Sequence, residues 1–130
     1  MEQLQRYDRL AAHWLVSAKA MRYLPYVDTL SRALLAEAKG DTRPDLLRIR
    51  ANYHHRMGYQ LKFRRDIPGA LRHFERSWSI LDSIAPRSAA ANAIEAIGVL
   101  YEAVGEPGLA MRYYDSTLVR VLQCDPVDRM

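Results

Sequence analysis

The chain contains a single cysteine, Cys124, which excludes an intrachain disulfide and a cysteine-based zinc site. No uncharged apolar run approaches the roughly 18 residues that a membrane-spanning helix needs. The opening segment MEQLQRYDRL carries acids and arginines but lacks the apolar stretch of a secretory signal. We therefore expect a cytoplasmic protein without a membrane span.

The sequence also lacks the residue sets of common enzyme classes. It has no glycine-rich phosphate loop and no pair of histidines at metal-binding helical spacing. His54 and His55 are adjacent, so they point about 100° apart on a helix, and together with His73 they do not predict a metal site. Cys124 has no activating base nearby in the sequence, so it is not predicted to be a nucleophile. We expect no enzymatic activity, no cofactor and no bound metal.

What the chain does have is an ordinary balance of residues, with 49% apolar and 26% charged among 130. This composition is typical of one folded domain with a modest core. The formal net charge is +4, and the excess is concentrated in residues 43–76, which hold nine lysines and arginines against three acids. Two interpretations stay open for this stretch: solvated helix faces, or an electropositive surface for an acidic partner.

The main pattern is an internal echo at an offset of forty residues, in which residues 51–86 align with residues 91–126. The identities are Ala51 with Ala91, Asn52 with Asn92, Gly58 with Gly98, Ala70 with Ala110, Arg72 with Arg112 and Pro86 with Pro126. Such a period indicates a helical hairpin that buries its apolar faces by stacking on neighbouring hairpins. A glycine inside a helix costs about 1 kcal/mol relative to alanine, so we expect Gly58 and Gly98 to permit close packing within their hairpins.

Apolar residues at spacings of three and four, separated by turns with proline, glycine and aspartate, predict an all-α domain spanning residues 1–130. The expected hairpins cover residues 2–39, 44–85 and 87–124, with helices at 2–22, 26–39, 44–64, 67–84, 87–104 and 107–123. Pro25 is expected to end the first helix, because the residue before a proline avoids the helical conformation. The first hairpin follows the forty-residue frame only loosely and is read as degenerate. Trp14 and Trp78 are expected in the core.

The positions that recur resemble the pattern of the tetratricopeptide repeat (TPR) family. In the third hairpin they are Ile94, Ile97, Gly98, Tyr101, Ala110, Tyr114, Thr117 and Pro126, and in the second His54, Met57, Gly58, Leu61, Ala70, Phe74, Ser77 and Pro86. The period of forty, against about 34 in the common form, is similar to a longer variety of this repeat. The resemblance implies three stacked hairpins in a short right-handed solenoid, with a ligand groove lined by the first helix of each hairpin.

In that frame the resemblance implies that the groove is lined by Lys19, Arg22, Asn52, His55, Arg56, Tyr59, Lys62, Asn92 and Glu95. The basic side chains suit an acidic segment or a C-terminal carboxylate. Asn52 and Asn92 can hydrogen-bond the backbone of an extended peptide, although a capping or solvent-facing role remains open for both. We therefore predict a non-enzymatic scaffold or adaptor that binds a protein or peptide segment in its groove.

Two alternatives stay open. The basic middle of the chain favours a helical repeat that binds single-stranded nucleic acid, but exposed aromatics are not interleaved with the arginines and the third hairpin is acidic in its groove positions. The other alternative is an oligomerisation or docking module of a longer regulator. The last helix is apolar on more than one face, so we expect Leu118, Val119 and Leu122 to pack against a second copy, a partner protein or further repeats.

Overall fold

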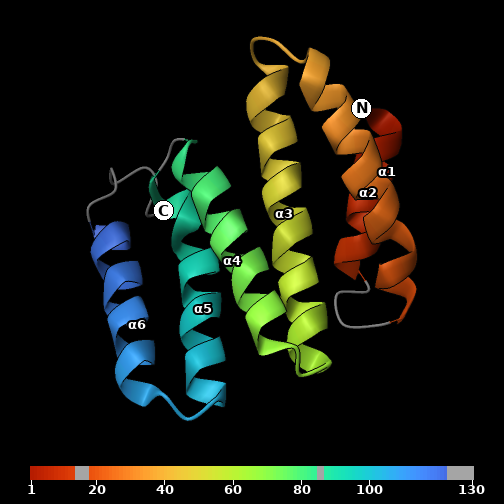
Figure 1. The fold of residues 1–130 in the computed structure, drawn as a ribbon. Helices are drawn as coiled ribbons and strands as arrows, with labels where there is room; N and C mark the ends of the chain where they lie inside the picture. Colours follow the sequence, from red (N-terminus) through yellow and green to blue (C-terminus); the bar gives the residue numbers. More distant parts are fainter. Residues whose placement is uncertain (14–17, 85–86, 123–130) are drawn as a thin grey trace.

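The computed structural model describes residues 1–13, 18–84 and 87–122, and in these residues the protein is all-α, with six helices and no strand (Figure 1). The helices are α1 (Glu2–His13), α2 (Ala18–Glu37), α3 (Thr42–Phe63), α4 (Ile67–Asp82), α5 (Ala91–Ala103) and α6 (Pro107–Leu122), and a short 3-10 helix, η1 (Arg87–Ala90), precedes α5. They pack as three adjacent hairpins, α1–α2, α3–α4 and α5–α6. This confirms the predicted fold class.

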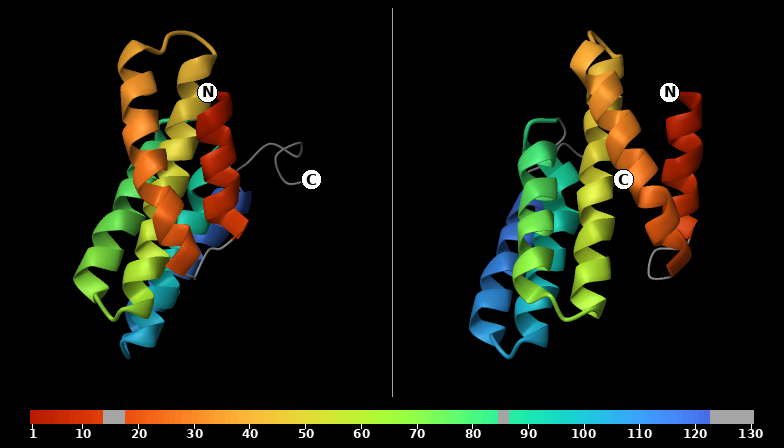
Figure 2. Two further views of the ribbon diagram at one scale, coloured as in Figure 1. Left: turned by 90° about the vertical axis from the view of Figure 1, so that its right-hand side faces the viewer. Right: turned by 45° about the vertical axis from the view of Figure 1, so that its right-hand side comes forward.

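The hairpins form a row in chain order. Figure 1 shows α1 and α2 at one end and α6 at the other, and the right-hand view of Figure 2 keeps α1 and α6 at opposite ends. Contacts between α2 and α3, and between α4 and α5, join each hairpin to the next. Among the helices described, none combines the length and the hydropathy that a membrane crossing needs.

The second helices of the second and third hairpins share both bounds at an offset of forty residues, since α4 spans Ile67–Asp82 and α6 spans Pro107–Leu122. The first helices end at the same offset, at Phe63 and Ala103, but α3 begins at Thr42 and α5 only at Ala91. The turns of these two hairpins are also alike. The backbone N–H of Asp66 donates to the Leu61 carbonyl, and that of Glu106 donates to the Tyr101 carbonyl, both at 2.9 Å. The residue before each donor has a positive φ, +63° at Arg65 and +83° at Gly105. Glycine adopts this conformation freely, whereas arginine does so at some cost.

Each of these two hairpins has a glycine where its helices approach most closely. A Cβ atom added to Gly58 would lie 2.5 Å from Cε1 of Phe74, and one added to Gly98 would lie 2.8 Å from Cε1 of Tyr114. Both distances are far below van der Waals contact, so an aromatic ring occupies the space of the missing side chain. The packing role expected for the two glycines is confirmed.

Two apolar clusters hold the row together. One joins the first three helices through Leu4, Val27, Leu46 and Ile49, and the other joins α4 to α5 through Ala70, Phe74, Ala96, Ile97 and Leu100. Trp78 packs half-buried against the second cluster, as predicted, while Trp14 lies outside the described residues.

The first hairpin differs from the prediction. The expected helix over residues 2–22 ends instead at His13, and α2 begins at Ala18 and continues through Pro25. A proline inside a helix costs about 3 kcal/mol. Leu24 and Val27 on either side of it are 1% and 0% exposed, and burying each such side chain stabilises the fold by about 1.5–3 kcal/mol. Packing therefore outweighs the local preference of Pro25. A smaller difference is that residues 87–90 form η1 rather than the first turn of α5.

Candidate functional site

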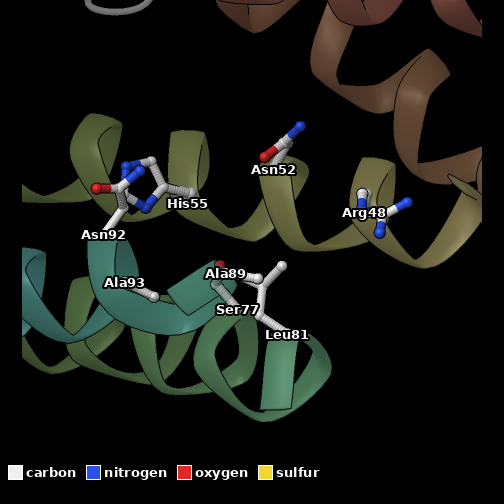
Figure 3. A pocket seen from close by; sticks show the side chains of 8 residues that line it. All are labelled: Arg48, Asn52, His55, Ser77, Leu81, Ala89, Asn92 and Ala93. Carbon is white, nitrogen blue, oxygen red and sulfur yellow. The ribbon is translucent and has the colours of Figure 1, made fainter. Parts of the chain in front are cut away.

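A cleft of about 250 Å³ opens between α3, α4 and the start of α5, and we call it the α3–α5 cleft (Figure 3). Its walls are Arg48, Asn52 and His55 from α3, Ser77 and Leu81 from α4, and Ala89, Asn92 and Ala93 from η1 and α5. Three of the residues predicted to line a groove, Asn52, His55 and Asn92, are therefore brought together.

The chain has only two asparagines, and both line this cleft. Asn52 on α3 and Asn92 on α5 occupy corresponding positions, forty residues apart, and both are exposed. Each amide offers one carbonyl acceptor and two N–H donors. Small and apolar side chains such as Ala93 and Leu81 line the cleft beside them. Amide groups beside an apolar wall can hydrogen-bond the backbone of a peptide segment without selecting for its side chains.

His55 is a further polar side chain that lines the cleft, beside Asn52 and Asn92. Its ring is half-buried, with its centroid 5.0 Å from the Tyr59 ring and 5.6 Å from the Phe74 ring. Burial, followed by the charge of Arg56, lowers the pKa of His55, so the imidazole is neutral at pH 7. A neutral ring offers one donor and one acceptor.

Further along α3, three more predicted residues lie near one another. The Nζ atom of Lys62 is 5.9 Å from the centroid of the Tyr59 ring. Burial raises the pKa of Tyr59, and the carboxylate of Glu95 on α5 raises it further. Tyr59, Lys62 and Glu95 thus lie near one another, but they do not line the α3–α5 cleft.

The structure does not gather the other predicted cations at the cleft. Arg56 forms an ion pair with Asp8 of α1, and the two side chains are only 11% and 18% exposed, so this arginine ties α3 to α1. Arg22 is exposed, and it belongs to α2 rather than to the first helix. Lys19 also falls in α2, and its side chain lies outside the described residues.

Arg48 is the charged residue of the α3–α5 cleft, and the sequence analysis did not predict it there. It pairs with Asp45 at 3.3 Å, with both side chains about half exposed. Arg48 precedes Asn52 by four residues and His55 by seven, so the three side chains share one face of α3. That spacing was visible in the sequence and is the signal that could have identified it.

Two histidines whose contact was not predicted from the sequence, His54 and His73, lie between α3 and α4. The Nδ1 atoms of His54 and His73 are 2.9 Å apart, so one ring donates a hydrogen bond to the other. Within residues 1–13, 18–84 and 87–122, no three His, Cys, Asp or Glu side chains group as metal ligands.

The residues predicted to form an oligomer interface lie on α6, at one end of the row. Leu118, Val119 and Leu122 are 56%, 49% and 60% exposed.

Compared with models of protein families, with curated proteins and with solved structures, the chain matches none. A function for the α3–α5 cleft therefore rests on its own chemistry.

Proposed function

We propose that the protein is a non-enzymatic interaction module that binds an extended segment of another protein in the α3–α5 cleft. The observation that carries this proposal is the placement of Asn52 and Asn92, which lie at corresponding positions of α3 and α5 and line one cleft. An extended peptide presents N–H and C=O groups along its length, and amide side chains can pair with both.

A short right-handed solenoid of the tetratricopeptide type is part of the proposal. The recurrence at forty residues of the bounds of α4 in α6, and of the turns that precede these two helices, supports it, as do the contacts of Gly58 with Phe74 and of Gly98 with Tyr114. In such a solenoid α3 and α5 would line the concave side, and both helices contribute residues to the α3–α5 cleft.

The charges around the cleft favour a segment that carries an acidic side chain. Arg48 lines the cleft and shares its charge with Asp45 in an exposed ion pair. A pair of that kind contributes only about 0.2–1 kcal/mol, so a ligand carboxylate can join it or replace Asp45 at little cost. His55 is neutral at pH 7 and adds no opposing charge.

Fluorescence anisotropy with labelled extended peptides of acidic, neutral and basic composition tests the proposal. We expect saturable binding that is tightest for the acidic set. Loss of one hydrogen bond costs about 0.5–1.5 kcal/mol, so the double variant Asn52→Ala with Asn92→Ala should bind about tenfold more weakly or worse.

The matched control is Gln5→Ala, which removes an exposed amide on α1 that does not line the cleft. Its affinity should equal that of the unmodified chain. An equal loss in the control and in the double variant would contradict the proposal, and so would an absence of saturable peptide binding. Tight binding of single-stranded RNA that weakens steeply with salt would favour the nucleic-acid alternative instead.

A further inference from the structure

Helix α6 exposes apolar residues whose counterparts on α4 are packed against α5. At the offset of forty residues, Met111 and Leu118 of α6 correspond to Leu71 and Trp78 of α4. Leu71 and Trp78 are half-buried against the apolar cluster that α4 and α5 share. Met111 and Leu118 are 57% and 56% exposed, because α6 ends the row (Figure 1).

A groove of about 300 Å³ runs between α5 and α6 and repeats part of the α3–α5 cleft. It is lined by Glu95, Tyr114, Thr117, Leu118 and Val121. Glu95, Thr117 and Val121 correspond at the same offset to His55, Ser77 and Leu81 of the α3–α5 cleft. The third wall of that cleft is the start of α5, and no helix in the described part of the chain supplies the equivalent wall here. The groove is thus open on the side where one further helix would fit.

The apolar surface of α6 is wider than a further hairpin would cover. Ser79 and Asp82 stay exposed on α4 even though α5 packs against that helix. The corresponding residues of α6 are Val119 and Leu122, which are 49% and 60% exposed. The apolar face of α6 therefore consists of Met111, Leu118, Val119, Val121 and Leu122. A further hairpin packed on α6 as α5 packs on α4 would leave Val119 and Leu122 exposed to water. Apolar residues at these two positions therefore indicate a partner that covers more of α6 than such a hairpin would.

The charges of α6 suit a second copy of the same helix. The one charged residue between Leu118 and Leu122 is Arg120, which turns toward α4 and pairs with Asp82 at 2.6 Å. Arg120 therefore adds no like charge where two such faces meet. Asp115 lies on the same side of α6, since it precedes Leu118 by three residues and Val119 by four, and the oppositely charged Arg112 precedes it by three.

At the other end of the row, the described residues of α1 do not offer a matching surface. Helix α1 exposes Glu2, Gln5, Arg6 and Arg9, so head-to-tail stacking would bury charges against the apolar face of α6. Of the large apolar side chains exposed in the described residues, five of nine lie on α6. Between the described surfaces at the two ends of the row, α6 is therefore the better complement to α6.

We propose that the protein forms a symmetric dimer in which α6 of each copy covers the apolar face of α6 in the other. Such an interface is isologous, so the same residues meet on both sides of a two-fold axis.

Sedimentation velocity and light scattering of the full chain, over a wide range of concentration, test this proposal. We expect a particle of twice the 15.0 kDa chain mass that dissociates on dilution. Val119→Glu places an unpaired carboxylate in the interface and should raise the dissociation constant about a hundredfold. The matched control Ser79→Glu adds the same charge at the corresponding exposed position of α4 and should leave the constant unchanged within about twofold.

Cross-linking shows which faces meet. In a Cys124→Ser background, Val119→Cys should form covalent dimers with a short bis-maleimide, whereas Ser79→Cys should not. A chain that stays monomeric at every concentration contradicts the proposal. The same holds if the chain is monomeric and binds a different protein through α6. A dimer that is indifferent to Val119→Glu, or that cross-links equally through Ser79→Cys, contradicts it as well.

Discussion

The Nδ1 atoms of His54 and His73 lie 2.9 Å apart between α3 and α4, so the pair holds together only while at least one ring is neutral. Burial lowers the pKa of His54 to about 4, and the charges of Arg50, His73 and Arg76 act in the same direction. Burial and Arg72 also lower the pKa of His73. The carboxylate of Asp28 opposes the shift at both rings without reversing it.

This pair predicts a loss of stability in mild acid. The unfolded chain binds a proton at His54 near pH 6.5 and the folded chain only near pH 4, so the free energy of unfolding falls as the pH falls through that window. Allowing for the partial exposure of the ring, we expect a loss of about 1–2 kcal/mol. Urea unfolding at pH 7.5 and pH 5 measures it, and His54→Gln should lose clearly less. An equal loss in this variant would refute the assignment.

The second prediction concerns Gly58. Alanine favours a helix over glycine by about 1 kcal/mol, but the new methyl group would overlap the Phe74 ring. We expect Gly58→Ala to destabilise the protein by about 1–3 kcal/mol in urea unfolding. Gly108→Ala is the control, because no atom lies within 4 Å of the Cβ position and this change should be neutral or stabilising. Equal effects of the two changes would show that Phe74 does not restrict Gly58.

The third prediction concerns the ion pair between Asp8 and Arg56. Because both side chains are mostly buried, Asp8→Asn leaves Arg56 without its charged partner and should cost about 1–3 kcal/mol. Amide protons of α1 should then exchange faster, since this pair joins α1 to α3. Asp45→Asn changes the exposed pair with Arg48 and should cost less than about 0.5 kcal/mol. Unchanged exchange in α1 would argue against a docking role for Arg56.

The fourth prediction compares two helix starts. The Asp66 carboxylate accepts a hydrogen bond from the Gly69 backbone N–H at 3.1 Å, and loss of such a cap costs about 1 kcal/mol. Asp41 stands before α3 without a side-chain capping bond. Thermal unfolding should therefore show a lower midpoint for Asp66→Ala than for Asp41→Ala, and the reverse order would contradict the capping geometry.

The later hairpins could be predicted because their turn signals are local. Asp66 followed by Ile67, Pro68 and Gly69 marks the start of α4, and α4 and α6 end within two residues of the predicted bounds. The first hairpin was also predicted, but the bounds of its two helices were wrong, since residues 14–17 contain neither glycine nor proline and the strongest local signal, Pro25, lies inside α2. Burial of Leu24 and Val27, which depends on the other helices, decided the outcome.

The candidate site was predictable to a similar extent. The period of forty places Asn52 and Asn92 on corresponding faces, and the structure has both in one cleft. The contact of His54 with His73 spans 19 residues and that of Arg56 with Asp8 spans 48. Both depend on how α3 is rotated against its neighbours, and the repeat pattern carries no information about that rotation.

The ion pairs of α3 also bear on how a ligand arrives. Arg50 and Arg56 belong to the basic stretch of residues 43–76, but Asp28 and Asp8, both from outside it, neutralise them. Beyond the Debye length of about 8 Å, an approaching molecule senses the paired charges rather than the arginines alone. Diffusional encounter should therefore gain less speed from electrostatic steering, and depend less on ionic strength, than the unpaired cations of this stretch would give. Under the proposed function, selectivity would then depend more on the lifetime of the bound complex, which short-range contacts with Asn52 and Asn92 would control.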